Sequence, residues 1–516
     1  MGTPFPGKWT WDHHPWLKGM HDSKAEKNVG QKAAQVGYTE LVLNLTFYTL
    51  DIKRLHCLYL LPNKFPDAAD FSVARFNQAV ELSPYLSSLG INTNNIGHKK
   101  FGQANLYIRG MNSRRALKGL PVSGLIFDEL DEMDREQITL AEARSDGQNE
   151  SWDWKISTPR IPNKGINQYY LESTEENFFF PCPHCSRQIE LKFPESIMVT
   201  GKDLDDPELI NSHYICYACK AKLDHETKSS YLTKGEWVPS RTNTAIRGFH
   251  VGQMYSSAKA GIPANFARRY IKSTLDPADE QEFFNSNVGI PHVVADAKLT
   301  EGEINRCIQS YEITDHAKST QLITMGIDVG KVCHFEVDEW LLSNYVGDEI
   351  NMNAVPKVLA YGTCDFDGLV KLMYNFQVRY AVIDAQPETR MAQEFAYKFP
   401  GYVKLCYYSY FVKAKNIGHS EVDMAITVNR TAWIDLALTR FRSQRILLPR
   451  TTSKEYKDHM CAQIKVPKRD KYGHAIYFYE TPGREADHFG HARTYAEIAL
   501  PLAMGIGPST NSEKVM

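Results

Sequence analysis

The stretch GQKAAQVGYTE, residues 30–40, decides the fold of the first part of the chain. It nearly matches the phosphate-binding loop Gly-x4-Gly-Lys-Ser/Thr, in which backbone N–H groups and a lysine contact phosphate oxygens. Tyr38 stands between Gly37 and Thr39, where that loop has its lysine. A lysine occurs instead at the head of the loop, as Lys32. Its flexible stem can bring the ammonium group to the phosphates from the opposite end, although an ordinary surface turn can also carry these residues.

A nucleotide hydrolase also needs an acidic pair at the end of a buried strand, with one carboxylate for Mg²⁺ and one to activate water. The segment GLIFDELDEMD supplies this pair as Asp128 and Glu129, directly after an apolar run. It follows the loop in the order that such folds require. An ordinary strand end can have the same sequence, so the acidic pair indicates a nucleotide hydrolase only in combination with the loop.

The segment WKISTPR indicates another strand, which ends in Ser157 and Thr158. Hydroxyl groups at such a strand end can sense the γ-phosphate and pass its loss to neighbouring segments. A plain strand-to-turn transition would look the same.

Two Cys-x2-Cys pairs follow this region: Cys182 with Cys185, and Cys216 with Cys219. Their spacing predicts a four-thiolate tetrahedral Zn²⁺ site, which is structural because all four coordination positions are filled. The six other cysteines are scattered singly, which favours a reducing compartment over a disulfide framework.

A set of three aspartates follows in the last part of the chain. Asp328 lies within the apolar strand ITMGIDVG, Asp384 ends the strand YAVID, and Asp487 begins the last helix. Two strand carboxylates and one helix carboxylate are typical of the ribonuclease H-like arrangement that holds two divalent ions for phosphodiester cleavage. Structural aspartates at strand ends are the alternative.

Bulk properties place limits on the class of protein. The 516 residues are 43% hydrophobic and 23% charged, as in a soluble globular protein with several domains. No apolar run approaches the ~18 residues of a membrane-spanning helix, and no signal region opens the chain, so we expect a cytosolic protein. The net charge of −2 means that nucleic acid must bind to local patches. One candidate patch, or a solvated hairpin tip, comprises Lys465, Lys468, Arg469 and Lys471.

These patterns predict an α/β fold in five parts: a P-loop (ASCE-type) ATPase domain with an inserted zinc ribbon, followed by a ribonuclease H-like nuclease domain. The expected boundaries are 1–175 for the ATPase domain, 176–245 for the zinc ribbon, 246–318 for a lid and linker, 319–500 for the nuclease domain and 501–516 for a flexible tail.

The order of variant loop, Asp-Glu strand, Ser-Thr-Pro strand, cysteine pairs and nuclease aspartates resembles the large terminase subunit of tailed bacteriophages. The lambda-like branch also has lysine at the head of its loop and reads Val-Gly-Tyr. The resemblance covers nearly the whole chain, including RGMNSRRALKG before the Asp-Glu strand and FFNSNVGIPH in the linker.

The resemblance implies an ATP-driven motor that packs double-stranded viral DNA into a procapsid, and a Mg²⁺- or Mn²⁺-dependent endonuclease that cuts the concatemer. Glu129 would be the catalytic base, Asp128 would support the metal, and Ser157 and Thr158 would couple hydrolysis to movement. The nuclease metals would be held by Asp328, Asp384 and Asp487. The nucleotide-binding residues would be Lys32, Gln35, Val36, Gly37, Tyr38 and Thr39.

The implied partners are DNA, a small terminase subunit, the portal protein and other copies of the chain in a ring, all in the host cell cytoplasm, with no membrane. His491 stands where family members often have a further acidic residue, and Gln35 stands where some relatives have arginine. The arginine that neutralises charge is therefore open among Arg109, Arg114, Arg115 and Arg144. Two other classes stay open: a ribonuclease H-like transposase or helicase-nuclease, and a non-hydrolysing DNA-binding scaffold with a degenerate loop.

Overall fold

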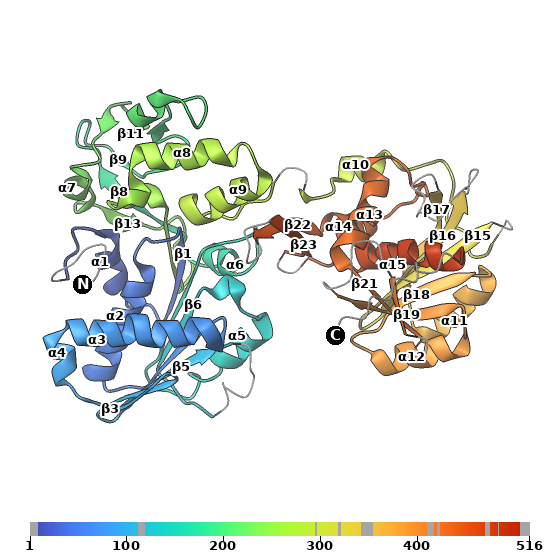
Figure 1. Ribbon diagram of the computed structural model, residues 1–516, viewed down its shortest axis with the longest axis horizontal. Coiled ribbons are helices and arrows are strands. Elements are labelled where there is room, and N and C mark those ends of the chain that lie inside the picture. Colours follow the sequence, from blue (N-terminus) through green and yellow to red (C-terminus); the bar gives the residue numbers. More distant parts are fainter. Residues whose placement is uncertain are drawn as a thin grey trace, which may run out of the picture. The chain divides into compact units, whose positions relative to one another are not determined.

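In the computed structural model of the chain, the strand that leads into the loop, β1 (Lys27–Lys32), lies inside an 11-stranded sheet (Figure 1). In spatial order the sheet comprises β13 (Glu236–Val238), β8 (Glu176–Pro181), β14 (Arg247–Val251), β1, β7 (Trp152–Ser157), β6 (Gly124–Asp128), β2 (Cys57–Leu61), β5 (Ala104–Gly110), β4 (His98–Phe101) and β3 (Ile91–Asn95), with β9 (Gln188–Ile189) paired to β8. The structure describes residues 9–111, 119–294, 297–317, 321–341, 354–409, 417–420, 424–469, 475–482 and 485–505.

The central strands of this sheet are parallel and buried. β2 and β6 have every residue buried, as expected for parallel strands that helices cover on both faces. β7 lies between β1 and β6, so the loop strand and the Asp-Glu strand are next-but-one neighbours. The carboxyl ends of these parallel strands meet at one edge of the sheet, where ligands bind in open α/β folds.

Two helical segments follow the loop, one on each side of β2 in the sequence. α2 (Tyr38–Asp51) follows the loop, and the amphipathic segment at 67–82 is helical over η2 (Phe71–Asn77) and α3 (Gln78–Leu82). The other α-helices before residue 294 are α1 (Trp16–His21), α4 (Pro84–Ser88), α5 (Arg135–Glu142), α6 (Ile166–Leu171), α7 (Lys228–Leu232), α8 (Pro263–Ser273) and α9 (Pro277–Glu282).

The cysteine region adds a small three-stranded sheet of β10 (Ile197–Met198), β11 (His213–Ile215) and β12 (Lys222–Leu223). It does not stand apart from the large sheet, because β8 and β13, on either side of it in the sequence, pair within that sheet. The segment 246–318, which we expected to be a lid and linker, is also divided. β14 pairs in parallel with β1, since an open edge of β1 would leave buried backbone groups without partners.

By its internal contacts the chain forms two units, Met1–Val294 and Ala295–Met516. The second unit contains a seven-stranded sheet in the order β17 (Val355–Cys364), β16 (Cys333–Leu341), β15 (Leu322–Val329), β18 (Tyr380–Asp384), β19 (Val403–Tyr408), β21 (Ala425–Val428) and β20 (Ile417–Ser420). The remaining elements are the hairpin of β22 (Ile464–Arg469) and β23 (Ala475–Glu480), and the helices α10 (Glu301–Asn305), α11 (Phe366–Asn375), α12 (Thr389–Lys398), α13 (Arg430–Arg442), α14 (Lys454–Cys461) and α15 (His488–Ala503).

The long helix α15 packs closely on β15 of the second sheet. Gly326 makes this contact possible, because a Cβ atom there would lie 1.9 Å from the Ala492 carbonyl oxygen. The predicted last helix and the predicted strands at Asp328 and Asp384 are therefore confirmed. The finer division of the chain into five parts remains a prediction.

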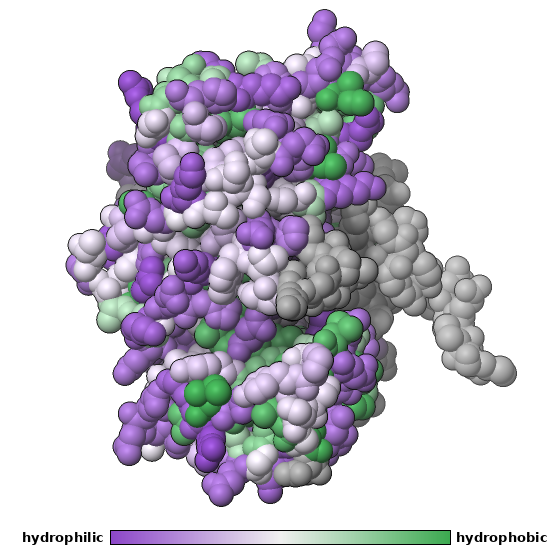
Figure 2. Space-filling view, turned by 90° about the vertical axis from the view of Figure 1, so that its left-hand side faces the viewer, coloured by the Kyte–Doolittle hydropathy of each residue, from purple (hydrophilic) through white to green (hydrophobic). Residues whose placement is uncertain are grey.

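No helix among the described residues is long and apolar enough to cross a membrane. The face drawn in Figure 2 is mostly hydrophilic, and its hydrophobic residues lie in small separate groups. Scattered apolar residues of this kind are normal on a protein surface and do not mark an interface.

Candidate functional site

The loop forms a concave turn between β1 and α2. Gln35 has φ 60° and Gly37 has φ 87°, so two residues near each other adopt the left-handed conformation. Gly37 suits this position, since a side chain with that φ would be strained and its Cβ would lie 3.0 Å from His14 and Leu17. Successive backbone N–H groups in such a turn point inward and form an anion-binding cavity. Gln35 itself is exposed.

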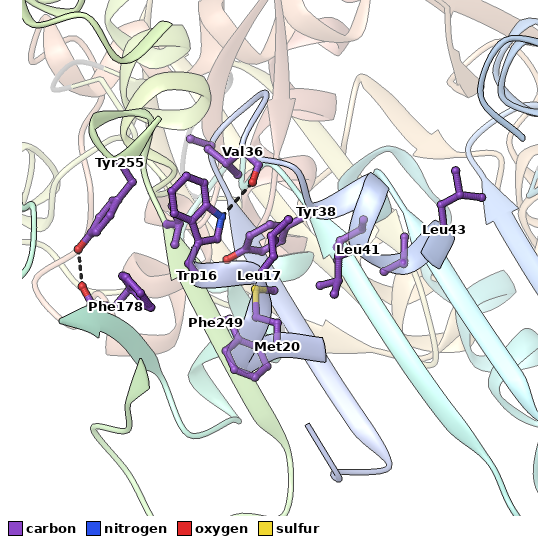
Figure 3. Packing of buried hydrophobic residues seen from close by; sticks show 14 of the residues in the cluster. Trp16, Leu17, Met20, Val36, Tyr38, Leu41, Leu43, Phe178, Phe249 and Tyr255 are labelled. Atoms are coloured by element: carbon purple, nitrogen blue, oxygen red, sulfur yellow. Dashed lines mark hydrogen bonds between the residues drawn. The ribbon is translucent and has the colours of Figure 1, made fainter. Parts of the chain in front are cut away.

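Contacts from distant segments hold the loop in shape. The Trp16 indole N–H donates to the Val36 carbonyl at 3.0 Å, as Figure 3 shows. The Ala34 N–H donates to the Ser286 carbonyl at 2.8 Å, and the Gln253 amide donates to the Ala34 carbonyl at 2.9 Å. The loop is therefore organised by the fold, and the predicted nucleotide contact at Val36 is limited to its backbone N–H.

The side chain of Tyr38 does not line the loop. Its ring is 1% exposed and lies among buried hydrophobic residues, including Leu17 and Leu41 (Figure 3). It covers Gly30 of β1, where a Cβ atom would lie 2.7 Å from the ring. We expected Tyr38 to bind nucleotide. Because its ring packs over Gly30, only its backbone N–H is left for such a contact.

The loop and the acidic pair meet at the carboxyl edge of the sheet. Lys32 Nζ lies 2.9 Å from Glu129 Oε1, and Thr39 Oγ1 lies 3.5 Å from Asp128 Oδ1. The Tyr59 hydroxyl donates to the other Asp128 oxygen at 2.6 Å. Nothing in the spacing of the sequence singles out Tyr59, whose role follows from the pairing of β2 with β6.

The two carboxylates differ in environment. Burial and the neighbouring Glu129 charge raise the pKa of Asp128 to about 6, against the opposing effect of Lys32. The Glu129 side chain is 44% exposed and its backbone has φ 61°, which turns the chain sharply out of the strand. Nucleotide hydrolysis requires one carboxylate that holds the metal ion and one that acts as a base towards water. The buried Asp128 fits the first role, and the accessible Glu129 fits the second.

Ser157 connects the next strand to the acidic pair. Its hydroxyl accepts a hydrogen bond from the Asp131 N–H at 3.1 Å and donates to the Thr158 carbonyl at 3.2 Å. Asp131 lies two residues after Glu129, and its carboxylate accepts from the Ile166 N–H at 2.6 Å. Burial raises the pKa of Asp131 to about 7. A continuous set of contacts therefore runs from Glu129 to the end of β7.

Two of the four arginines proposed for charge neutralisation, Arg109 and Arg144, donate hydrogen bonds to backbone carbonyl groups close to them in the sequence. Arg109 donates to the Ile108 carbonyl at 3.0 Å, and Arg144 donates to the Leu140 carbonyl at 3.3 Å. Arg114 and Arg115 lie outside the described residues.

The four cysteine sulfurs converge. Cys182 and Cys219 Sγ are 3.9 Å apart, as are Cys185 and Cys216 Sγ, and all four lie within 4.8 Å of one another. Zinc–sulfur bonds of about 2.3 Å in a tetrahedron require sulfurs about 3.8 Å apart. The Cys219 N–H also donates to Cys216 Sγ at 3.4 Å. This set of donors fits a zinc ion.

In the second unit, Asp328 and Asp384 end neighbouring strands. β15 and β18 run in parallel with Ile327 opposite Ile383, so the two aspartates follow side by side. Burial raises the pKa of Asp384, whose carboxylate accepts from the Gln386 N–H at 3.0 Å, and the charge of Asp328 raises it further.

Asp487 is bound by its neighbours at the start of α15. Its Oδ2 accepts from the Thr481 hydroxyl at 2.6 Å and lies 3.2 Å from His491 Nε2. Burial alone would raise the pKa of Asp487, but the hydrogen bond and charge of His491 lower it well below its usual value. His491 thus pairs with the predicted third ligand.

Two histidines that the sequence did not suggest lie beside Asp328. His334 on β16 is the direct cross-strand partner of Asp328, and His488 Nδ1 is 2.8 Å from Asp328 Oδ2. The three ligand atoms lie within 4.8 Å of one another. Among the described residues, this group does not include Asp384 or Asp487. The three-aspartate metal site remains a prediction. The sequence signal was weak, since each histidine stands alone in its segment.

Three residues of the candidate basic patch, Lys465, Lys468 and Arg469, belong to β22. Lys465 Nζ is 2.8 Å from Asp435, so its charge is already neutralised. Lys471 lies outside the described residues.

An α/β sheet with a phosphate-type loop at its carboxyl edge and an acidic pair two strands away defines a nucleotide-binding ATPase domain. Residues 3–237 match the family model of the phage terminase large subunit gpA, ATPase domain. This match confirms the predicted resemblance to large terminase subunits.

The chain is also similar to two curated proteins and, in its fold, to a solved structure. The chain is 24% identical over 251 residues to the large terminase subunit of Enterobacteria phage P21, covering 44% of this chain and 37% of that protein. It is 21% identical over 369 residues to that of Escherichia phage lambda, covering 64% and 56%. The chain thus spans 37% and 56% of these relatives' lengths. The HK97 bacteriophage large terminase shares the fold, with a TM-score of 0.50 and 11% identity over 93% of this chain and 92% of that one.

Proposed function

We propose that this chain is the ATPase and nuclease subunit of a viral DNA-packaging motor. It would hydrolyse ATP to move double-stranded DNA into a procapsid and would cut concatemeric DNA in a metal-dependent reaction. The observation that carries this proposal is the meeting of Lys32 with Glu129 and of Thr39 with Asp128, at 2.9 Å and 3.5 Å.

At the ATP site, Lys32 and the N–H groups of residues 35–39 bind the phosphates. Thr39 and Asp128 are the residues that would hold Mg²⁺, which supplies positive charge to the phosphate oxygens when bound. In the structure, Glu129 is paired with Lys32. A phosphate that attracts the Lys32 ammonium group releases Glu129, which then accepts a proton from the attacking water.

Coupling to movement starts from Ser157 and Thr158. The proposal is supported by the hydrogen bond from the Asp131 N–H to Ser157, because Asp131 follows Glu129 on the same turn. A shift of Glu129 on hydrolysis would therefore reach the end of β7.

The cysteine module has a structural role in this proposal. Cys182, Cys185, Cys216 and Cys219 would hold one Zn²⁺ ion as a zinc ribbon. The separation of 3.9 Å between paired sulfurs supports this ligand set.

For the nuclease, we infer a ribonuclease H-like domain in which Asp328, Asp384 and Asp487 serve Mg²⁺ or Mn²⁺ ions. The side-by-side ends of β15 and β18 support the pairing of Asp328 with Asp384. Asp487 needs a rearrangement of its contacts with Thr481 and His491 before it can take part.

The proposed partners are double-stranded DNA, a small terminase subunit, a portal protein and further copies of the chain in a ring, in the host cell cytoplasm. They follow from the resemblance to large terminase subunits.

An ATPase assay with and without duplex DNA tests the proposal. We expect ATP hydrolysis that DNA stimulates, and no turnover by Glu129→Gln, although this variant should still bind nucleotide. If the wild-type chain binds DNA without hydrolysing ATP, it is a scaffold with a degenerate loop. Unwinding or strand transfer instead of translocation would indicate a helicase-nuclease or a transposase.

A further inference from the structure

We propose that Asp328, His334 and His488 form a metal site of the second unit, and that its two imidazoles select a first-row transition ion over Mg²⁺. The catalytic consequence rests on the nuclease function proposed above, whereas metal binding itself does not.

The three side chains come from three different elements. Asp328 lies on β15, and His334 is its direct partner on the antiparallel strand β16. Directly opposed residues project from the same face of a sheet. His488 is the first residue of α15, and its Nδ1 lies 2.8 Å from Asp328 Oδ2. One carboxylate and two imidazoles thus meet, with ligand atoms within 4.8 Å of one another.

His334 provides an independent indication of a bound ion. Its side chain is 7% exposed, and its Nδ1 has no hydrogen-bond partner among the described residues. A buried polar atom without a partner is unfavourable, and such atoms in native proteins often contact an ion or water. The His334 ring stacks on that of His488 with centroids 4.4 Å apart, so the pair is already ordered.

Three other titratable groups lie near these ligands: His459, Asp487 and Asp384. The His459 ring lies 5.8 Å from both His334 and His488, and its Nδ1 accepts from the Phe489 N–H at 3.5 Å. Asp487 pairs with His491. Asp384 is the nearby carboxylate that could serve a second ion, because it ends the strand next to Asp328.

The ligand chemistry decides the class of ion. Mg²⁺ prefers six oxygen ligands in strict octahedral geometry, whereas imidazole favours ions such as Zn²⁺, Fe²⁺ and Co²⁺. Two histidines and one carboxylate leave open positions for water or a phosphate oxygen. This set differs from an all-aspartate site, which would take Mg²⁺ readily.

Co²⁺ titration of the full chain, prepared with zinc retained, tests the proposal. The visible absorption of Co²⁺ reports imidazole ligands, and thiolate coordination gives a separate near-ultraviolet band that identifies any binding to the cysteines. We expect His334→Gln and His488→Gln each to weaken Co²⁺ binding by about 10-fold to 100-fold. His316→Ala, which removes an exposed histidine of the same unit, should bind as the wild type does.

Two results would overturn the site: unchanged Co²⁺ affinity in both glutamine variants with wild-type thermal melting, or displacement of Co²⁺ by an equal concentration of Mg²⁺. If one variant fails to fold, the other decides, since the histidines lie on different elements. Plasmid cleavage separates this proposal from the nuclease function. Co²⁺ binding without cleavage would reject only the nuclease, and full Mg²⁺-dependent cleavage by His334→Gln would reject only the imidazole site.

Discussion

The position of the loop lysine is exchanged: Tyr38 stands where a phosphate-binding loop has lysine, and Lys32 stands at the head of the loop instead. Lys32 is 5% exposed and ends β1, where its ammonium group pairs with Glu129. Tyr38 is buried over Gly30. The exchange is possible because the lysine stem is long enough to approach the carboxyl edge from the strand itself.

We predict that Lys32→Ala lowers ATP hydrolysis by about 10² to 10⁴, because it removes a charge that stabilises the transferring phosphoryl group. Phosphate release at saturating ATP measures this effect. Tyr38→Phe is the matched control, since its hydroxyl has no partner among the described residues and the ring is kept. Wild-type rates in Lys32→Ala would show that the loop does not bind phosphate from its head.

At the scale of elements, the cysteine module joins two sheets. β8 leads into the first cysteine pair and β11 leads into the second, so an ion held by all four sulfurs would connect the large sheet to the small one. In modules of this size the free energy of metal binding contributes directly to folding.

Cys216→Ser should therefore lose bound zinc and melt at a lower temperature than the wild type. Elemental analysis and thermal unfolding measure the two effects on the same preparation. Cys461→Ser, which changes a partly buried cysteine outside the module, should keep both properties. Purified wild-type protein without zinc would contradict the assignment.

A buried charge network connects α15 to β16 and α13. Arg493 bonds to Glu336 at 2.7 Å, to Glu497 at 2.8 Å and to Asp338, and Arg440 bonds to Glu497 at 2.6 Å. All five side chains are fully buried. Three carboxyl groups face two guanidinium groups, so the charges balance when one carboxyl is protonated. Burial, opposed by the charge of Arg493, raises the pKa of Asp338 to about 8, and burial also raises the pKa of Glu336.

The pH dependence of stability follows from this shift. In the unfolded chain an aspartate has a pKa of about 4. From about pH 4 to about pH 8 the Asp338 carboxyl therefore holds its proton only in the folded state. The contribution of Asp338 to the free energy of unfolding therefore falls as pH rises, and it levels off above pH 8. Asp338→Asn should flatten this slope in urea unfolding of the second unit. The exposed Asp315→Asn should leave it unchanged, and an equal slope in both variants would reject the assignment.

At the scale of the whole molecule, the proposed ATPase and nuclease residues lie in different units. Lys32, Asp128 and Glu129 belong to Met1–Val294, and Asp328 and Asp384 belong to Ala295–Met516. Each unit has its own sheet and its own hydrophobic core. The two activities should therefore respond separately to mutation.

Asp328→Asn keeps the shape of the side chain but weakens metal binding, so cleavage of duplex DNA should fall by orders of magnitude. ATP hydrolysis should stay near the wild-type rate. Plasmid nicking and phosphate release on one preparation measure both activities. Unimpaired nicking would refute the nuclease role of Asp328, and loss of both activities would show that the units depend on each other.

The sequence by itself predicted the elements that local patterns specify. The loop at 30–40, the strand ending in Asp128 and the strands at Asp328 and Asp384 all lie where expected. Hydrophobic periodicity and glycine placement are local signals, so they can be read without knowledge of the fold. The cysteine spacing predicted the convergence of the four sulfurs for the same reason.

Only the tertiary structure showed how distant residues meet. The pairing of β15 with β16 brings His334 beside Asp328, and the start of α15 adds His488. The pairing of β14 with β1 places residues that we expected in a linker inside the main sheet. Strand register and helix docking depend on contacts between residues far apart in the chain, and no local pattern specifies them.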